Sequence, residues 1–183
     1  MKGKKSKGNI VLIGFMGVGK GRAARMLAEK TGKFGVDCDD LIESFANTRV
    51  KKIFAEFGEP HFRKLERKVA SWLEKKVRDT IISTGGGFYN VPNIHKIGTV
   101  VYLHSDFDEI LKAIQKHPNA KKKIKKRPLL QDLDAARKLF NQRLPIYRDV
   151  ADIEIKVKGK SIEKITAEIC KKLALNSVII SKH

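Results

Sequence analysis

The sequence has only two cysteines and no long apolar run. Cys38 and Cys170 lie far apart, without metal-ligand spacing, so we expect two reduced thiols in a cytoplasmic protein. No apolar stretch approaches the roughly 20 residues of a membrane-spanning helix. The basic start of the chain resembles a secretory signal, but glycines interrupt the apolar run that follows and no small-residue cleavage site comes after it. We therefore expect residues 1–8 to form a basic tail, and no membrane partner.

Acidic side chains are also few compared with basic ones. The chain has 20 Asp and Glu against 39 Lys and Arg, a formal net charge of +19, which favours anionic partners. Aromatic residues make up only 7% of the chain, the lysines are scattered and no nucleic-acid motif is evident, so nucleic acid is not the expected partner. The composition favours a lysine-rich solvated surface that attracts small anions, with a nucleic-acid-binding protein as the alternative.

The 183 residues fit one α/β domain, residues 1–183, in which short strands alternate with helices. Short β-branched runs alternate with helical periodicity, and right-handed connections between the strands imply an open parallel sheet covered by helices on both faces. Ligands of such sheets bind beyond the carboxyl ends of the strands. The predicted strands are residues 9–14, 35–37, 81–84, 99–103 and 153–157, and the predicted helices include 20–31, 132–147 and 161–173.

A glycine-rich loop, GFMGVGKG at residues 14–21, lies between the first predicted strand and helix. Its glycines allow backbone N–H groups to turn toward phosphates at the helix N-terminus, and Lys20 can reach the β- and γ-phosphates. A plain tight turn is the alternative, which the lysine and the flanking elements disfavour. The predicted ATP-binding residues here are Gly17, Val18, Gly19, Lys20, Gly21 and Arg22.

Gly21 stands where phosphate-binding loops usually carry Ser or Thr. That hydroxyl normally binds Mg²⁺, and glycine has none. The loop therefore supports nucleotide binding better than it supports metal chemistry.

Two further clusters follow the second and third predicted strands: Asp37-Cys38-Asp39-Asp40 and Gly85-Gly86-Gly87. The carboxyl ends of parallel strands meet at one edge of a sheet, so we expect both clusters beside the glycine-rich loop. The aspartates could instead cap the next helix, and Asp40 is expected to fill that capping or a solvated role. The triple glycine could be a flexible turn.

Together these motifs resemble the shikimate kinase family, small P-loop kinases with the nucleoside-monophosphate-kinase fold. The resemblance covers residues 9–173 and implies a three-layer α/β/α domain whose five-stranded parallel sheet has the order 2-3-1-4-5. It further implies a substrate-binding helical region at 34–77, a mobile lid at about 117–130, and a monomer. The motifs that carry it are Gly14-Phe15-Met16-Gly17, Asp37-Cys38-Asp39 with Ile42-Glu43, Phe62-Arg63 with Glu66, Gly85-Gly86-Gly87, Arg127-Pro128-Leu129, and Arg143 with Pro145-Ile146-Tyr147.

The resemblance implies transfer of the γ-phosphoryl group of ATP to the 3-hydroxyl of shikimate, with Mg²⁺ as cofactor and with ATP and shikimate as small-molecule partners. Arginine suits a planar carboxylate such as that of shikimate. The implied roles are catalysis by Lys20, Asp39 and Arg127; ATP binding by the loop and Arg127; shikimate binding by Asp39, Arg63, Gly85, Gly86, Gly87 and Arg143; orientation of Arg63 by Glu66; and metal binding by Asp37.

One departure from the family pattern leaves alternatives open. The family loop typically ends Gly-Lys-Ser-Thr, whereas this chain has Gly19-Lys20-Gly21-Arg22. A catalytically weakened paralogue that binds both ligands is therefore the main alternative. A related kinase acting on gluconate or a nucleoside monophosphate is another, and the residues that contact adenine cannot be assigned from sequence.

Overall fold

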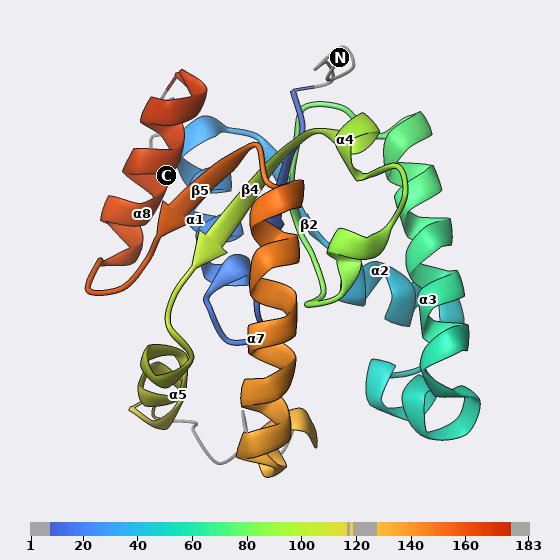
Figure 1. Ribbon diagram of the computed structural model, residues 1–183. Coiled ribbons are helices and arrows are strands. Elements are labelled where there is room, and N and C mark those ends of the chain that lie inside the picture. The colour runs from blue at the N-terminus through green and yellow to red at the C-terminus, as the bar shows by residue number, and fades with distance from the viewer. Residues whose placement is uncertain (1–7, 117, 119–127, 177–183) are drawn as a thin grey trace.

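The sheet has five parallel strands in the order β2-β3-β1-β4-β5 (Figure 1). The computed structural model describes residues 8–116, 118 and 128–176. The order predicted from the resemblance is confirmed. The strands are β1 (Ile10–Ile13), β2 (Phe34–Asp37), β3 (Thr80–Ser83), β4 (Thr99–His104) and β5 (Ile153–Lys156).

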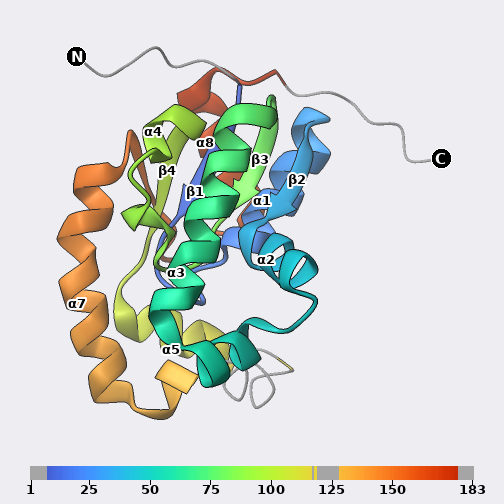
Figure 2. The ribbon, with the colours of Figure 1, turned by 90° about the vertical axis from the view of Figure 1, so that its right-hand side faces the viewer.

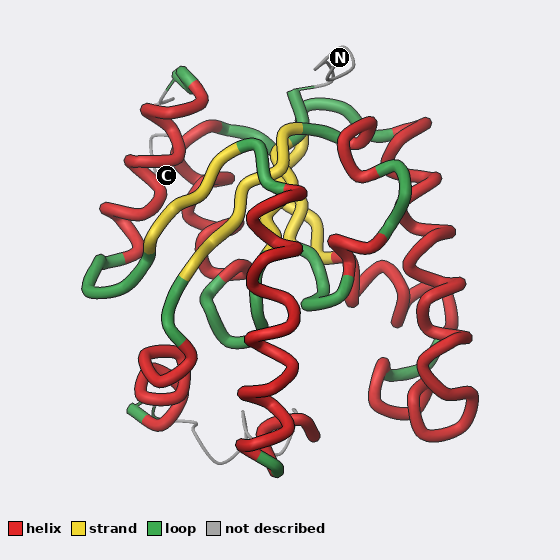
Figure 3. Tube along the Cα trace, viewed as in Figure 1, coloured by secondary structure: helices red, strands yellow, loops and turns green. Residues whose placement is uncertain are grey.

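Helices cover both faces of the sheet, because the central strands are apolar on both sides. Ile10 and Leu12 of β1 pack in the same apolar cluster as α1 (Lys20–Thr31) and α8 (Ile162–Leu173). Val11 and Ile13 face the cluster that includes α3 (Val50–Lys76), α4 (Ile94–Ile97), α5 (Phe107–Gln115) and α7 (Leu133–Val150). Figure 3 shows the strands enclosed by these helices.

The buried side chain of Asn9 links three elements at the amino end of the sheet. Its amide nitrogen donates to the carbonyl oxygens of Val77 (3.0 Å) and Ile97 (2.9 Å), and its oxygen accepts from the Thr80 N–H (3.0 Å). These bonds satisfy backbone groups at the starts of neighbouring strands. The opposite, carboxyl end of the sheet is left for ligands.

The predicted helical region at 34–77 consists of the edge strand β2, then α2 (Cys38–Ala46) and the long α3 (Val50–Lys76). α3 is kinked at Gly58, whose φ of 74° and ψ of 175° are outside the helical range, and Pro60 follows. Proline is accepted there because it begins the second helical segment, where its missing N–H is not needed. In Figure 2, α2 lies beside β2, and α3 passes in front of the sheet.

Two short 3₁₀ helices, η1 (Phe88–Asn90) and η2 (Pro128–Gln131), complete the described elements. None of the helices in the described ranges has the length and apolar character that crossing a bilayer requires. Cys38 and Cys170 are both buried free thiols. The basic tail expected at 1–8 lies outside the described residues except for Gly8, and so does most of the lid expected at 117–130, including Arg127.

Candidate active site

The glycine-rich loop connects β1 to α1 and has a backbone that requires glycine. Gly19 precedes the helix with a φ of 106°, and Gly17 has a φ of 83°. A Cβ atom at Gly17 would lie 2.7 Å from the Cδ1 atom of Ile114 on α5. Side chains are therefore excluded at both positions, and the N–H groups of the loop and of the first turn of α1 are left for an anion.

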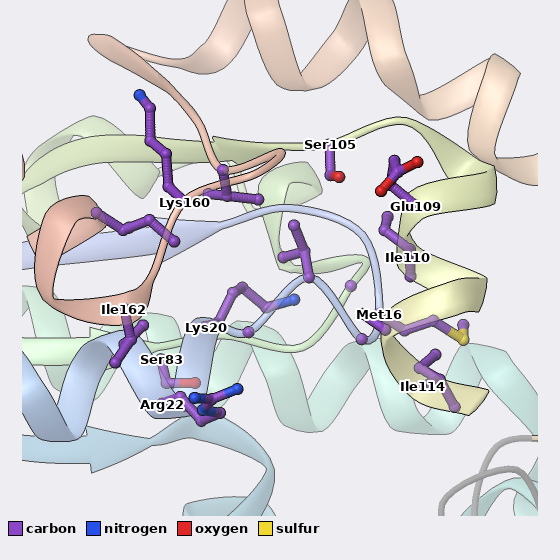
Figure 4. A pocket seen from close by; sticks show the side chains of 18 of the residues that line it. Met16, Lys20, Arg22, Ser83, Ser105, Glu109, Ile110, Ile114, Lys160 and Ile162 are labelled. Carbon is purple, nitrogen blue, oxygen red and sulfur yellow. The ribbon is translucent and has the colours of Figure 1, made fainter. Parts of the chain in front are cut away.

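Lys20 is buried at the start of α1. Its ammonium group donates to the carbonyl oxygens of Gly14 (2.7 Å) and Phe15 (3.2 Å). Figure 4 shows its side chain inside the pocket formed by the loop. The cation is thus held at the loop before a ligand binds, as a phosphate-binding lysine requires.

Within the aspartate cluster, Asp37 fills the capping role that the sequence left open. Asp37 ends β2 beside Ser83 of β3, and its carboxylate accepts a hydrogen bond from the Asp39 N–H (2.9 Å), which makes Asp37 the N-cap of α2. Of the two roles expected for Asp40, capping does not apply, because the cap must precede the first helical turn, where Asp40 already lies. Asp40 is exposed to solvent, so its solvated role is confirmed.

Asp39 is an unusually basic carboxylate. Burial, and next the negative charge of Asp37, raise its pKa from 3.8 to about 6, against the opposing effect of Lys20. Its Oδ1 atom is buried and has no hydrogen-bond partner among the described residues. A ligand hydroxyl that donates to this oxygen would satisfy it.

The triple glycine packs directly against the functional side chains. A Cβ atom at Gly85 would lie 2.9 Å from Asp39 Oδ1, and one at Gly87 would lie 2.6 Å from the Cζ atom of Arg63. Arg143 on α7 donates to the carbonyl oxygen of Gly86 (3.1 Å). The close approach of these groups explains the three glycines and argues against a merely flexible turn.

Glu66 forms an ion pair with Arg63, which fits the orienting role expected for it. Its carboxylate is 2% exposed and lies 2.5 Å from an Arg63 guanidinium nitrogen, so the pair is not a surface ion pair. Burial raises the pKa of Glu66, while the positive charges of Arg63 and Arg143 oppose that rise. Within the described part of the chain, Glu66 Oε1 and Arg143 Nε are buried without hydrogen-bond partners. These unpaired atoms indicate a site built for a polar ligand.

A pocket of about 710 Å³ joins the glycine-rich loop to the aspartates and the triple glycine. It continues to α5 and to the β5–α8 loop, where Lys158, Gly159 and Lys160 contribute to its wall (Figure 4). Sequence reasoning missed this wall, although residues that follow β5 lie at the same carboxyl edge of the sheet. It also missed Arg25 of α1, which lines the pocket beside Asp37 and Ser83.

Asp37 and Ser83 offer oxygen ligands on adjacent strand ends. The described residues contain no group of three or more acidic, histidine or cysteine side chains that could hold a metal ion. This donor set fits Mg²⁺, which commonly takes one or two protein oxygens and completes its shell with phosphates and water.

A model of the family described as shikimate kinase matches residues 16–174. The chain belongs to the shikimate kinase family. The shikimate kinase of Lactococcus lactis subsp. cremoris is 40% identical over 169 residues, which span 90% of this chain and 97% of that protein. The shikimate kinase of Chromobacterium violaceum is 37% identical over 177 residues, 93% of this chain and 92% of the relative.

Solved structures of the family superpose on this chain. Shikimate kinase from Acinetobacter baumannii, in complex with shikimate, gives a TM-score of 0.79 at 31% identity and covers 91% of this chain and 92% of its own. A gluconokinase from Sinorhizobium meliloti gives a TM-score of 0.55 at 11% identity. The match covers 93% of this chain and 94% of the gluconokinase, and it shows the fold alone. The family membership inferred from the sequence motifs is thus confirmed.

Proposed function

We propose that this shikimate kinase family member transfers the γ-phosphoryl group of ATP to the 3-hydroxyl of shikimate, giving ADP and shikimate 3-phosphate. The observation that carries the proposal is the meeting of Asp39, Arg63 and Arg143 around the triple glycine, next to the loop that holds Lys20. An acid–base group, two carboxylate-binding cations and a phosphate loop are the parts this reaction needs.

The phosphates of ATP would bind the N–H groups of residues 17–22, with Lys20 at the β- and γ-phosphates. The base and ribose would fill the part of the pocket bounded by the β5–α8 loop, Lys158 to Ser161, because β5 lies at the opposite edge of the sheet from β2, which leads to Asp39. Arg127, outside the described residues, is proposed to contact the phosphates when ATP is bound.

The acceptor would lie on the other side, against the triple glycine. Arg63 and Arg143 would bind its carboxylate, with Glu66 holding Arg63 in position. The attacking hydroxyl would donate to Asp39, which accepts the proton as the new oxygen–phosphorus bond forms and the bond to the ADP oxygen breaks. A carboxylate with a raised pKa accepts that proton more readily than an ordinary one.

Mg²⁺ would be held by Asp37, with Ser83 beside it and the ATP phosphates supplying further ligands. When bound, it neutralises charge that develops on the phosphates. Asp37 is already oriented for this role by its hydrogen bond from the Asp39 N–H.

Two of the sequence-based alternatives are not favoured by the site. Two guanidinium groups near one buried carboxylate suit an acceptor with a planar carboxylate better than a nucleoside monophosphate. Lys20 and Asp39 are both in place, so apart from the loop end at Gly21 and Arg22 no feature of the described site favours a catalytically weakened paralogue. We further propose that the protein acts as a monomer in the cytoplasm, which size-exclusion chromatography and cell fractionation would test.

The acceptor is tested by measuring ADP release with ATP and Mg²⁺ in the presence of shikimate, of gluconate or of no acceptor. Arg143→Gln should raise the KM for shikimate by about tenfold to a hundredfold, because a charge-assisted bond is worth about 1.5 to 3 kcal/mol. The KM for ATP should change little. Equal release with gluconate, or an unchanged KM in Arg143→Gln, would contradict the assignment.

A further inference from the structure

Arg25 lies on α1 one helical turn after Gly21, and the reaction as described does not use it. It is an exposed residue of the pocket wall, in the same pocket as Asp37 and Ser83. A Cβ atom at Gly21 would lie 3.6 Å from the Nη1 atom of Arg25 and 4.0 Å from the Oγ atom of Ser83. A guanidinium group therefore stands next to the place where a Ser or Thr side chain would begin.

This arrangement replaces a metal-binding hydroxyl with a cation. Gly21 brings no oxygen to the metal, and a guanidinium group cannot ligate a metal because it has no acceptor. It does carry a permanent positive charge and several N–H donors in a plane, which suit phosphate oxygens. Where other phosphate loops hold the phosphate through a hydroxyl-bound Mg²⁺, the guanidinium group of Arg25 can here contact the phosphate directly.

Arg25 is available for this contact. Among the residues that the structure describes, no carboxylate forms an ion pair with it. Arg63 and Arg137, in contrast, are each paired with acidic side chains. Because Arg25 is also solvent-exposed at the pocket, it can turn toward a phosphate without breaking an internal bond of the described structure.

We propose that Arg25 is a phosphate-positioning residue that supplies, beside Gly21, part of the positive charge that a hydroxyl-bound metal supplies in other phosphate loops. The inference rests on the proposed ATP site. It means that ATP binding in this chain depends less on Mg²⁺ than it would with a serine at position 21.

The test measures ATP affinity by calorimetry without an acceptor, once with Mg²⁺ and once with excess EDTA. In the unaltered protein, EDTA should weaken binding by less than about tenfold. In Arg25→Gln, metal-free binding should weaken further by about tenfold or more, while binding with Mg²⁺ should change by less than about threefold. Arg25→Lys should recover part of the metal-free affinity, because it keeps the charge.

Two further variants complete the comparison. Gly21→Ser restores the hydroxyl group. The contact distances around position 21 are long enough to accept a serine side chain. This variant should increase the effect of Mg²⁺ on ATP affinity. Arg67→Gln removes an exposed arginine of α3 that is not part of the pocket wall, and controls for loss of one positive charge.

The proposal is overturned if Arg25→Gln binds metal-free ATP as the unaltered protein does, if it weakens binding equally with and without Mg²⁺, or if Arg67→Gln has the same effect. It is also overturned if the unaltered protein binds no ATP in EDTA. Because no acceptor is present, these outcomes are independent of whether shikimate is the substrate.

Discussion

At the scale of single residues, the buried position of Asp39 makes its carboxylate more basic and lowers the stability of the folded protein at neutral pH. Its pKa is raised to about 6 by burial and by Asp37, so the charged form is less favourable in the folded protein than in the unfolded chain. The sign follows from linkage: the folded state binds more protons between about pH 4 and pH 6, so this group lowers stability as pH rises through that range.

Asp39→Asn should therefore stabilise the ligand-free protein at pH 7 by about 1 to 3 kcal/mol, since each pK unit corresponds to about 1.4 kcal/mol. The gain should shrink below pH 4, where Asp39 itself is neutral. Turnover should fall by about 10²- to 10⁴-fold. Urea unfolding at the two pH values checks the first claim, and a variant that is less stable at pH 7 would contradict it.

Gly87 leaves room for the guanidinium group of Arg63, so a side chain at this position should weaken shikimate binding. A methyl group there would meet the guanidinium of Arg63, whose Cζ atom lies 2.6 Å from the added Cβ position. Arg63 would be displaced, so Gly87→Ala should raise the KM for shikimate by about tenfold or more and leave the KM for ATP nearly unchanged. Steady-state kinetics with each substrate varied in turn measures both.

Gly35→Ala is the matched control, because its nearest neighbour, Ala28 Cβ, would lie at an ordinary 3.8 Å. If both variants change the two KM values equally, the effect of Gly87→Ala does not come from Arg63.

At the scale of elements, the kink of α3 separates the tip of the helical region from the segment that carries Arg63 and Glu66. Gly58 holds a backbone conformation that is almost confined to glycine, while the space around it is open apart from Pro60 Cδ at 3.6 Å. Gly58→Ala should therefore lower the free energy of unfolding by about 1 to 3 kcal/mol through backbone strain alone.

Urea denaturation measures this difference, with Gly21→Ala as the comparison. Gly21 lies inside α1 with ordinary contact distances around it, so alanine there should be neutral or stabilise the protein by up to about 1 kcal/mol. An unchanged stability in Gly58→Ala would show that the kink is not specified by glycine.

The elements also show how far sequence reasoning reaches. The strands and the loop with Lys20 were predictable because β-branched runs and glycines at special positions leave local signals, and neighbouring strand ends bring Asp39 to the triple glycine. The β5–α8 loop lies at the same carboxyl edge but has no distinctive motif, and Arg25 carries no local signal, since its place in the pocket depends on how α1 packs. The capping bond of Asp37 was one of two roles that the sequence left open, because a cap and a site ligand look alike in sequence.

At the scale of the whole molecule, the formal charge of +19 should attract ATP more strongly than shikimate, because ATP carries more negative charge. Raising the ionic strength from about 0.05 to 0.5 M shortens the screening length severalfold. The KM for ATP should rise by a few fold, and that for shikimate by less. Equal rises would assign the effect to general salt inhibition instead of electrostatic attraction.

Asp39 and Lys20 are proposed to carry out phosphoryl transfer to shikimate. The most direct measurement is detection of shikimate 3-phosphate by ³¹P NMR after incubation with ATP, Mg²⁺ and shikimate, for the unaltered protein, Lys20→Ala and Asp39→Asn. The unaltered protein should give shikimate 3-phosphate and equimolar ADP, and both variants should lose most of this product. ADP without phosphorylated shikimate, or undiminished product in either variant, would contradict the proposal.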